Sequence, residues 1–328
     1  MIHAPAEQFP SQSALDFLAK KWDLRDIVFV RKMENIVFSC NSPSGRAYLR
    51  LTTPLRRMRP EILAEIHWIE HLAKSGLKVP TILPDIGGNK VVSLTDGNQH
   101  YEAVVFSEIK GEHPKEQIAA NSQFLQTLGS LVGKMHQASE IYESSHLEGK
   151  REDWLQERGL RHAITAAKMS KEQALFARLK KAVSWMESLP RNPGNYGLVH
   201  ADLGALNMFV GEDDTIGIID FDDSCYHWYA FDLAIVIFSM AGRFNHVNFS
   251  AEETEWLSHL LIGYRKVRPF SEQEALLIPH FINFATLRLF FWIESHETLG
   301  TFHKDSLEKV AHLKEWTKKW AENSHDFL

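Results

Sequence analysis

The stretch His200-Ala-Asp-Leu-Gly-Ala-Leu-Asn207, followed after a short gap by Ile219-Asp220-Phe221-Asp222-Asp223, says most about this chain. It holds a carboxylate, a carboxamide and a second carboxylate at a spacing that suits transfer of the terminal phosphoryl group of a nucleotide. Asp202 can accept a proton from a hydroxyl, and Asn207 and Asp220 offer the hard oxygen ligands that Mg2+ prefers. The motif therefore predicts phosphoryl transfer that depends on Mg2+.

Each residue of the motif also has a plain structural interpretation. A lone aspartate such as Asp202 is most often a turn residue, and Asn207 alone fits a turn or a helix cap. Asp220 alone fits the end of a strand, but it directly follows an apolar run, where ligand groups commonly lie. His200 is expected to hold the shape of the loop rather than to take part in the chemistry.

The sequence up to residue 108 favours a small β-rich lobe, because short apolar and β-branched runs alternate with turn signals. A capping box that starts at Ser13 is expected to open the first helix. The predicted elements are a helix to Trp22, strands at 27–31, 36–40 and 46–52, a helix at 60–75, and a hairpin of 91–94 with 101–106. Residues 1–108 are therefore predicted to form the nucleotide-binding lobe.

From residue 109 to residue 328 the pattern is mainly helical. Helices are predicted at roughly 121–138, 152–168, 171–189, 229–241, 252–266, 272–297 and 304–323. The exception is 196–220, where three short strands are separated by the polar loops that carry the motif. The fold class is therefore α+β, with two lobes as in protein kinases: a small antiparallel sheet, then a larger helical lobe with the catalytic loop, the metal loop and the acceptor pocket.

Composition indicates the cellular compartment of the protein and excludes some classes of binding partner. The net charge of −6 argues against a general nucleic-acid binder. The two cysteines, Cys40 and Cys225, form no disulfide framework, so a reducing, cytoplasmic setting is expected. Residues 1–10 show no secretory signal. The apolar stretches 229–242 and 278–293 are too short or too interrupted to span a bilayer, so we expect buried helices and no membrane partner.

The pattern His-x-Asp-x-x-x-x-Asn at 200–207, followed by Ile-Asp-Phe-Asp-Asp at 219–223, resembles the aminoglycoside phosphotransferase and choline kinase superfamily. The resemblance implies a protein-kinase-like fold and an enzyme that phosphorylates a small molecule with ATP and Mg2+. The run Tyr229-Ala-Phe-Asp232-Leu-Ala234 resembles the helix that follows the family's metal loop. By this resemblance Asp232 stabilises the catalytic loop and does not touch the substrate.

The resemblance extends upstream into the first lobe. Glu34 and Asn35 resemble the family's nucleotide loop, and the backbone of Ser107 to Ile109 resembles the hinge that binds adenine. Glu65 resembles the helix glutamate that pairs with a phosphate-binding lysine. This chain carries Arg50 at the lysine position, and the planar fork of an arginine is not equivalent to an ammonium group. Arg50 therefore puts a normal nucleotide affinity in question.

The acceptor pocket is expected in the helical lobe near the motif. Asp222 and Asp223 fit three roles equally well: a second metal ligand, a contact to a substrate cation, or a solvated pair in a loop. Trp228 belongs to an aromatic run that can hold an ammonium group beside a carboxylate, although such a run also fits a core. The family's glycine after the histidine is Ala201, and Gly204 stands where many relatives carry a polar residue.

The leading hypothesis is an ATP-dependent kinase of a hydroxyl on a small molecule, such as an amino alcohol, a sugar or an aminoglycoside. One alternative is a nucleotide-binding regulatory protein with a kinase fold, which Arg50 suggests and which the presence of Asp202, Asn207 and Asp220 together opposes. A protein Ser/Thr kinase is disfavoured because no Ala-Pro-Glu segment follows the metal loop. A metal-dependent hydrolase would leave the catalytic loop unexplained. The sequence does not indicate an oligomeric state.

Overall fold

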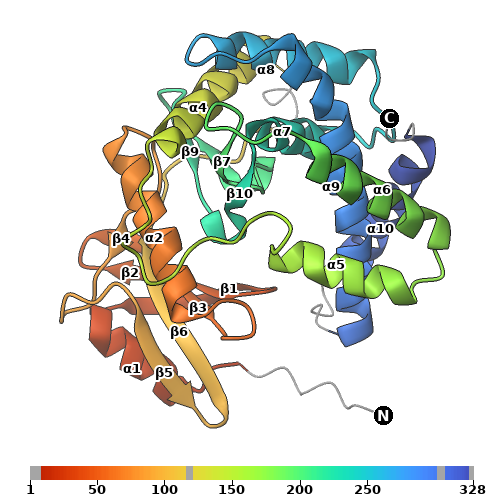
Figure 1. The fold of residues 1–328 in the computed structure, drawn as a ribbon. Coiled ribbons are helices and arrows are strands. Elements are labelled where there is room, and N and C mark those ends of the chain that lie inside the picture. Colours follow the sequence, from red (N-terminus) through yellow and green to blue (C-terminus); the bar gives the residue numbers. More distant parts are fainter. Residues whose placement is uncertain (1–8, 116–120, 301–306, 325–328) are drawn as a thin grey trace. The chain divides into compact units, whose positions relative to one another are not determined.

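The computed structural model describes residues 9–115, 121–300 and 307–324 of the chain (Figure 1). The chain forms two units: unit 1 consists of Met1–Lys110 with Glu143–Lys150, and unit 2 of Gly111–Tyr142 with Arg151–Leu328. The division after Lys110 lies two residues beyond the boundary predicted at residue 108, and the short stretch 143–150 joins unit 1 although it was assigned to the second lobe. The first eight residues of the predicted first lobe and the start of the helix predicted at 304–323 lie outside the described residues.

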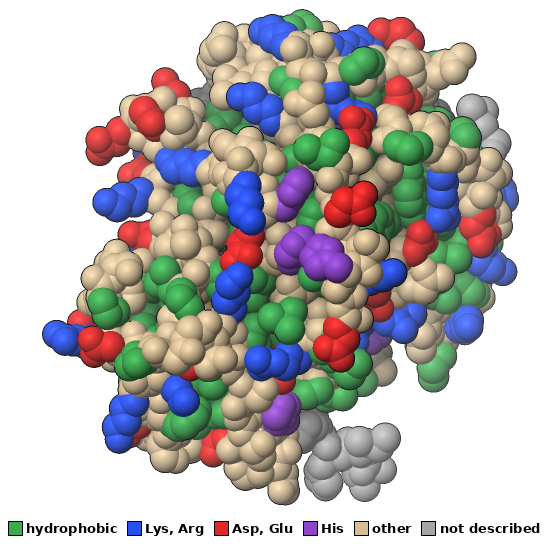
Figure 2. Space-filling model, turned by 60° about the vertical axis from the view of Figure 1, so that its left-hand side comes forward, with side chains coloured by type: hydrophobic (Ala, Val, Ile, Leu, Met, Phe, Trp, Pro, Cys, Tyr) green, Lys and Arg blue, Asp and Glu red, His purple; other side chains and the backbone are tan. Residues whose placement is uncertain are grey.

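Acidic and basic side chains are both abundant in this chain, which has 36 Lys and Arg against 42 Asp and Glu. On the face shown in Figure 2 the two kinds are interspersed, so that face does not present a field of one sign.

Unit 1 is built on an antiparallel sheet. Its strands lie in the order β1 (Arg25–Lys32), β2 (Ile36–Ser42), β3 (Gly45–Thr52), β6 (Gln99–Ser107) and β4 (Ile82–Leu83), and β5 (Val92–Asp96) also pairs with β6. The turn at Asp96-Gly97-Asn98 joins β5 to β6 as predicted, with Gly97 at a φ of 58° that glycine adopts without strain. β4 was not predicted, because two residues carry no periodicity.

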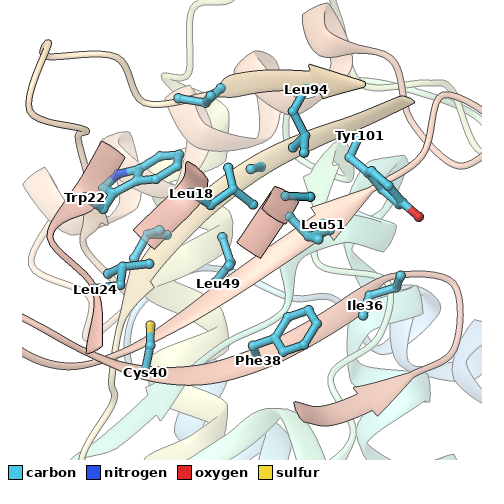
Figure 3. Close-up of a cluster of buried hydrophobic side chains, with 14 of the residues drawn as sticks. Leu18, Trp22, Leu24, Ile36, Phe38, Cys40, Leu49, Leu51, Leu94 and Tyr101 are labelled. Atoms are coloured by element: carbon cyan, nitrogen blue, oxygen red, sulfur yellow. The ribbon is translucent and has the colours of Figure 1, made fainter. Parts of the chain in front are cut away.

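Helix α1 (Gln12–Trp22) covers one face of this sheet and completes its core (Figure 3). Its buried side chains Leu18 and Trp22 pack among Phe38, Leu49 and other side chains from the strands. Each fully buried side chain of this size stabilises the fold by about 1.5–3 kcal/mol. The N-cap is Ser11, whose hydroxyl accepts a hydrogen bond from Ala14 N, so the capping box predicted at Ser13 was wrong by two residues.

Helix α2 (Arg59–Lys74) buries the apolar face that its spacing predicted, and Glu65 lies on the same buried face. The stretch 143–150 packs against this helix: the rings of His146 and His67 lie 5.0 Å apart in an edge-on contact. Gly149 comes so close to Pro60 that an added Cβ would lie 2.2 Å from its carbonyl oxygen. Unit 1 is therefore discontinuous in the sequence.

Unit 2 is mainly helical. Its helices are α4 (Ser122–Glu140), α5 (Arg158–Met169), α6 (Gln173–Ser188), α7 (Tyr229–Arg243), α8 (Ala251–Arg265), α9 (Glu272–Leu299) and α10 (Leu307–Asn323). Helices α4 and α8 approach each other through glycines: a Cβ on Gly129 would lie 1.9 Å from Leu260 O, and one on Gly263 would lie 1.8 Å from Gln126 O. Neither position admits a larger side chain without movement of backbone.

Helix α9 is apolar along most of its length and packs against α5, α6, α7 and α10. By length and composition alone it could cross a membrane, and it is the one helix in the described ranges that meets this test. A helix from a protein core can have the same length and composition, and 61% of the apolar window of α9 is buried inside the protein. Its packing within unit 2 is that of a core helix.

Two short antiparallel hairpins carry the loops of the motif. β7 (Tyr196–Val199) pairs with β10 (Cys225–Trp228), and β8 (Met208–Val210) pairs with β9 (Ile216–Ile218). The chain runs from β7 through the catalytic loop to β8, turns back along β9, and passes through the metal loop to β10. β10 was not predicted, since its sequence Cys225-Tyr-His-Trp228 shows no strand-like alternation.

Candidate active site

The pairing of β8 with β9 brings the two halves of the motif together. Met208 pairs with Ile218, and just beyond this pair Ile219 N donates to Asn207 O at 3.0 Å. Asn207 and Asp220, thirteen positions apart in the sequence, therefore lie at the ends of adjacent strands. Asp220 itself adopts a left-handed backbone, with a φ of 65°, directly before the short helix Phe221–Asp223.

Asp232, fully buried at the start of α7, holds the backbone of the catalytic loop. Its carboxylate accepts hydrogen bonds from His200 N at 2.9 Å and Ala201 N at 2.7 Å. His136 on α4 also contacts this carboxylate, at 3.1 Å from Nε2, and its Nδ1 lies 2.8 Å from the Tyr264 hydroxyl. These contacts tie the backbone at His200 and Ala201 to the start of α7, and the supporting role of Asp232 stays a prediction.

The ring of His200 braces the catalytic loop against the metal loop. Its Nδ1 accepts from Asp202 N at 3.2 Å, so Nε2 carries the proton and donates to Ile219 O at 3.0 Å. His200 is fully buried and is held at both ring nitrogens. This geometry supports a structural role and leaves the ring no free nitrogen for chemistry.

Ala201 has a φ of 66°, in the left-handed region that glycine occupies without strain. A side chain there costs about 1–2 kcal/mol. At the position of the family's glycine, this alanine therefore strains the backbone. The short hydrogen bond from Ala201 N to Asp232 helps to hold this conformation.

Asp202 and Asn207 form a direct contact. The Asn207 side-chain nitrogen donates to Asp202 Oδ2 at 2.7 Å and to the Asp202 carbonyl oxygen at 2.9 Å. Both hydrogens of the amide nitrogen are thus committed to Asp202, which fixes the orientation of the amide and leaves Oδ1 as the oxygen that can bind a cation. On Asp202, Oδ2 is held and Oδ1 is the atom left for a substrate proton.

Asp202 is an exposed residue, although protein atoms lie close around its carboxylate. Burial, followed by the negative charges of Asp223 and Asp220, raises the pKa of Asp202 from 3.8 to about 7, against the opposing effects of Asn207 and Arg288. A base whose pKa lies near neutral pH is well suited to accept a proton. The surroundings thus make Asp202 a better base than an ordinary aspartate.

Asn207 and Asp220 fit a Mg2+ ion in the chemistry of their oxygen atoms and in number. One amide oxygen and one carboxylate are too few for an all-protein cage, and Mg2+ commonly binds through one or two carboxylates together with substrate phosphates. Over the described ranges, no group of three or more His, Cys, Asp or Glu has the geometry of a self-sufficient metal centre. The assignment of these two ligands stays a prediction.

Asp222 and Trp228 are buried, at 3% and 2% exposed. The Asp222 carbonyl oxygen accepts a hydrogen bond from Arg151, which also donates to Ser224 O at 2.8 Å. A solvated loop pair is therefore the wrong description for Asp222. The Trp228 indole donates to Pro190 O at 3.0 Å and its ring packs on other aromatic rings, as in a core; Asp223 is only partly buried.

In unit 1, Arg50 on β3 and Glu65 on α2 form a buried bidentate ion pair, with both N–O distances at 2.8 Å. The Arg50 guanidinium also lies 4.9 Å from the centre of the Phe106 ring. The pairing expected of the family's lysine is therefore made by an arginine. Its effect on nucleotide affinity stays a prediction.

The other predicted nucleotide residues of unit 1 have partners within the unit. Glu34 pairs with Arg56 at 2.8 Å, next to the turn that contains Asn35. At the hinge, Ser107 N donates to Thr81 O and Glu108 N donates to Arg46 O. Because Ser107 N and Glu108 N already donate within unit 1, they are not available to adenine. The predicted adenine contact is therefore left to Ile109 N and to the backbone carbonyl groups of residues 107–109.

Arg288 on α9 is a residue near the site that the sequence did not single out. It pairs with Glu157 at 2.9 Å, and it acts electrostatically on both Asp202 and Asp223. An arginine inside an apolar helix was a visible signal, since a charge there requires a partner. Its neighbours come from distant parts of the chain, and no local pattern reveals them.

Comparisons with known proteins agree with this geometry. A model described as "Phosphotransferase enzyme family" matches residues 27–271. Amicoumacin kinase of Bacillus subtilis (strain 168) is 26% identical over 308 residues, 93% of this chain and 90% of that protein. Homoserine kinase of Rhodopseudomonas palustris (strain TIE-1) is 27% identical over 316 residues, 91% of this chain and 90% of that protein.

Solved structures extend the likeness to the fold. The complex of amicoumacin kinase hAmiN with AMP-PNP, Ca2+ and Ami aligns with a TM-score of 0.83 at 25% identity, over 96% of this chain and 94% of that one. A microcompartment-associated aminopropanol kinase aligns with a TM-score of 0.74 at 23% identity, over 94% and 95% of the two chains. The α+β fold class predicted from the sequence is thereby confirmed.

Proposed function

This chain belongs to the phosphotransferase enzyme family, and on that premise we propose the roles of its residues and the class of its acceptor. It is an ATP-dependent kinase of a small-molecule hydroxyl, as the sequence predicted. In our proposal Asp202 takes the proton of that hydroxyl, and Asn207 and Asp220 hold Mg2+. The observation that carries the proposal is the contact of 2.7 Å between Asn207 and Asp202 Oδ2.

The contact between Asn207 and Asp202 gives the two carboxylate oxygens of Asp202 different roles. Asn207 holds Oδ2, so in our proposal Oδ1 of Asp202 receives the proton of the acceptor hydroxyl. The hydroxyl oxygen bonds to the γ-phosphorus while the bond from that phosphorus to the departing ADP breaks. In a loose transition state the proton leaves late, so orientation of the hydroxyl matters as much as basicity. Asn207 and Asp220 would hold a Mg2+ ion together with the nucleotide, and such an ion would supply positive charge against the phosphate oxygens. Arg50, held by Glu65, is assigned to the nucleotide phosphates.

For the acceptor we propose an amino alcohol. Asp220 and Asp223 both act electrostatically on Asp202 in unit 2, and this concentration of negative charge favours a cationic acceptor. Two of the similar proteins are named for homoserine and aminopropanol, each of which carries an amine and a hydroxyl. A protein acceptor is less well supported, because the chain passes directly from Asp223 through β10 into α7, without a long segment after the metal loop.

The test is MgATP consumption with a panel that contains L-homoserine, aminopropanol, ethanolamine, amicoumacin and spectinomycin. With the best acceptor, Asp202→Asn is expected to lower kcat by about 100-fold or more while MgATP still binds. Asp220→Asn is expected to weaken MgATP binding itself. The exposed Asp214→Asn serves as the matched control with normal kinetics. Full turnover in Asp202→Asn would remove the proposed base.

A further inference from the structure

Arg288 is a partly buried positive charge that has no role in the proposed phosphoryl transfer. It lies on α9, with its side chain 19% exposed, and one edge of its guanidinium contacts Glu157. Nε and Nη2 donate to the same oxygen, Glu157 Oε2, at 3.2 and 2.9 Å. The arginine is therefore held along one edge only.

Glu157 is a rigid anchor for this arginine. It caps the N-terminus of α5: Oε1 accepts from Gly159 N at 2.6 Å, and Oε2 accepts from Leu160 N at 2.8 Å. The residue is 3% exposed. Because the helix fixes the carboxylate and the carboxylate fixes the guanidinium, Arg288 has little freedom to reorient.

The opposite edge of Arg288 retains its donors. Over the ranges that the structure describes, the two N–H groups of Nη1 make no hydrogen bond. Although burial opposes the charge, Glu157 and Asp223 together raise the pKa of Arg288, so the group stays cationic. Its charge also reaches Asp202, the base for the acceptor. A preorganised donor pair thus lies within electrostatic range of the reacting carboxylate.

The free N–H groups of the Arg288 guanidinium can bind a planar group that carries oxygen, such as a carboxylate or a carboxamide. Guanidinium donors bind carboxylate oxygens, and also carboxamide oxygens, with defined geometry, whereas an ammonium group would be repelled. Asp223 is the complementary partner for an ammonium. The two charges together fit an acceptor that bears an amine and a carboxyl-derived group on one carbon, next to the chain that ends in the hydroxyl.

We propose that Arg288 is a specificity-determining residue that binds a carboxyl-type oxygen of the acceptor, from either a carboxylate or a carboxamide. The inference rests on the proposed function and refines its acceptor class from an amino alcohol to a hydroxy-amino acid or its amide. Glu157 and Gly159 are positioning residues, because they touch Arg288 and not the acceptor. An added Cβ on Gly159 would lie 2.7 Å from Arg288 Nη2.

Three acceptors that differ in one group test the inference: L-homoserine, L-homoserinamide and 3-amino-1-propanol. The last is homoserine without its carboxylate. Wild-type enzyme is expected to prefer the first two in kcat/KM by about 10-fold or more. Arg288→Met is expected to raise the KM for these two acceptors by about 10- to 100-fold, with little change for 3-amino-1-propanol or in the KM for MgATP. A larger loss for homoserine than for its amide identifies the carboxylate as the ligand; equal losses identify the carbonyl oxygen.

Two further variants protect the test from a folding defect. Gly159→Ala keeps every charge but displaces the guanidinium, and it should give a smaller loss with the same selectivity between acceptors. Arg161→Met, at an exposed arginine of α5, should leave the preference unchanged. If Arg288→Met does not fold, the kinetics of Gly159→Ala on the three acceptors test the inference instead.

Equal losses on all three acceptors would assign Arg288 a structural role and overturn the inference. So would a wild-type enzyme that does not prefer the carboxyl-bearing acceptors, or one that phosphorylates only other members of the wider panel. The proposed function fails separately, when no acceptor supports MgATP-dependent phosphorylation at all.

Discussion

The Asp202 carboxylate lies among other negative charges, and burial with Asp223 and Asp220 raises its pKa to about 7 from an ordinary 3.8. The folded state therefore binds this proton more tightly than the unfolded state. The resulting stability is fully present below about pH 4 and is lost as the pH rises through about 7. Above that pH the ionised Asp202 destabilises the fold.

We expect Asp202→Asn to stabilise the metal-free protein at alkaline pH. The gain should reach about 1 kcal/mol near pH 8, a value reduced for solvent screening because the side chain keeps exposed surface, and it should fade towards pH 4. Thermal unfolding in EDTA at a series of pH values measures it. The exposed Asp214→Asn should show no such trend. A gain that is independent of pH would contradict the electrostatic origin.

Residues of the site differed in how well the sequence revealed them. The closeness of Asp202, Asn207 and Asp220 was predictable because two loops and one short hairpin hold them, and their roles stay predictions. Asp232 was found through the family pattern. Arg288 was not, because its contact with Glu157 joins residues 131 positions apart. Trp228 illustrates the converse: its aromatic neighbours suggested a ligand, while its burial is that of a core residue.

At the scale of elements, the Arg50–Glu65 pair couples β3 to α2 inside unit 1. Removing one partner of a buried pair leaves an uncompensated charge and costs about 3–5 kcal/mol. Arg50→Met is therefore expected to destabilise strongly, and Arg50→Lys less, because it keeps the charge but loses the bidentate geometry and the contact with Phe106.

Urea unfolding of the single variants and of the double variant Arg50→Met/Glu65→Met measures this coupling. The double variant should recover much of the loss, since neither charge is then buried alone. Strictly additive losses would show that the pair is not coupled. If Arg50→Lys instead tightened ATP binding without loss of stability, Arg50 would lower the affinity for ATP. It would then not stabilise the contact between β3 and α2.

The contact between α4 and α8 reverses the usual effect of a glycine in a helix. Gly→Ala inside a helix normally stabilises by about 0.5–1 kcal/mol. At Gly263 the added methyl group would lie 1.8 Å from Gln126 O, so we expect Gly263→Ala to destabilise by about 1–3 kcal/mol or more. Gly133→Ala on α4, where the nearest atom is 3.1 Å away, should cost much less. Chemical denaturation distinguishes them, and equal effects would rule out close packing as the cause.

Long elements were predictable and very short ones were not. Helices such as α2 and α9 follow from apolar spacing over many residues, and their observed ends differ from the predicted ends by at most two positions. β4 and β10 hold two and four residues, and they form because longer strands offer them backbone partners. Tertiary pairing, and not local preference, creates these strands.

At the scale of the whole molecule, the order of β-rich and helical sequence was enough to predict an α+β kinase-like chain. Which short stretch joins which unit was beyond sequence pattern. Residues 143–150 have no apolar periodicity, and they belong to unit 1 through single contacts such as that of His146 with His67. A boundary drawn from composition therefore places them in the second lobe, whereas they pack with unit 1.

The discontinuity of unit 1 also limits how a gene for this protein can be divided. A fragment that stops after codon 110 encodes unit 1 without residues 143–150. The part of α2 around Pro60 and His67 then lacks the residues that pack against it. A single crossover at codon 110 between related genes would therefore combine Met1–Lys110 of one parent with residues 143–150 of the other. To keep unit 1 whole, both of its segments, Met1–Lys110 and Glu143–Lys150, must come from the same parent gene.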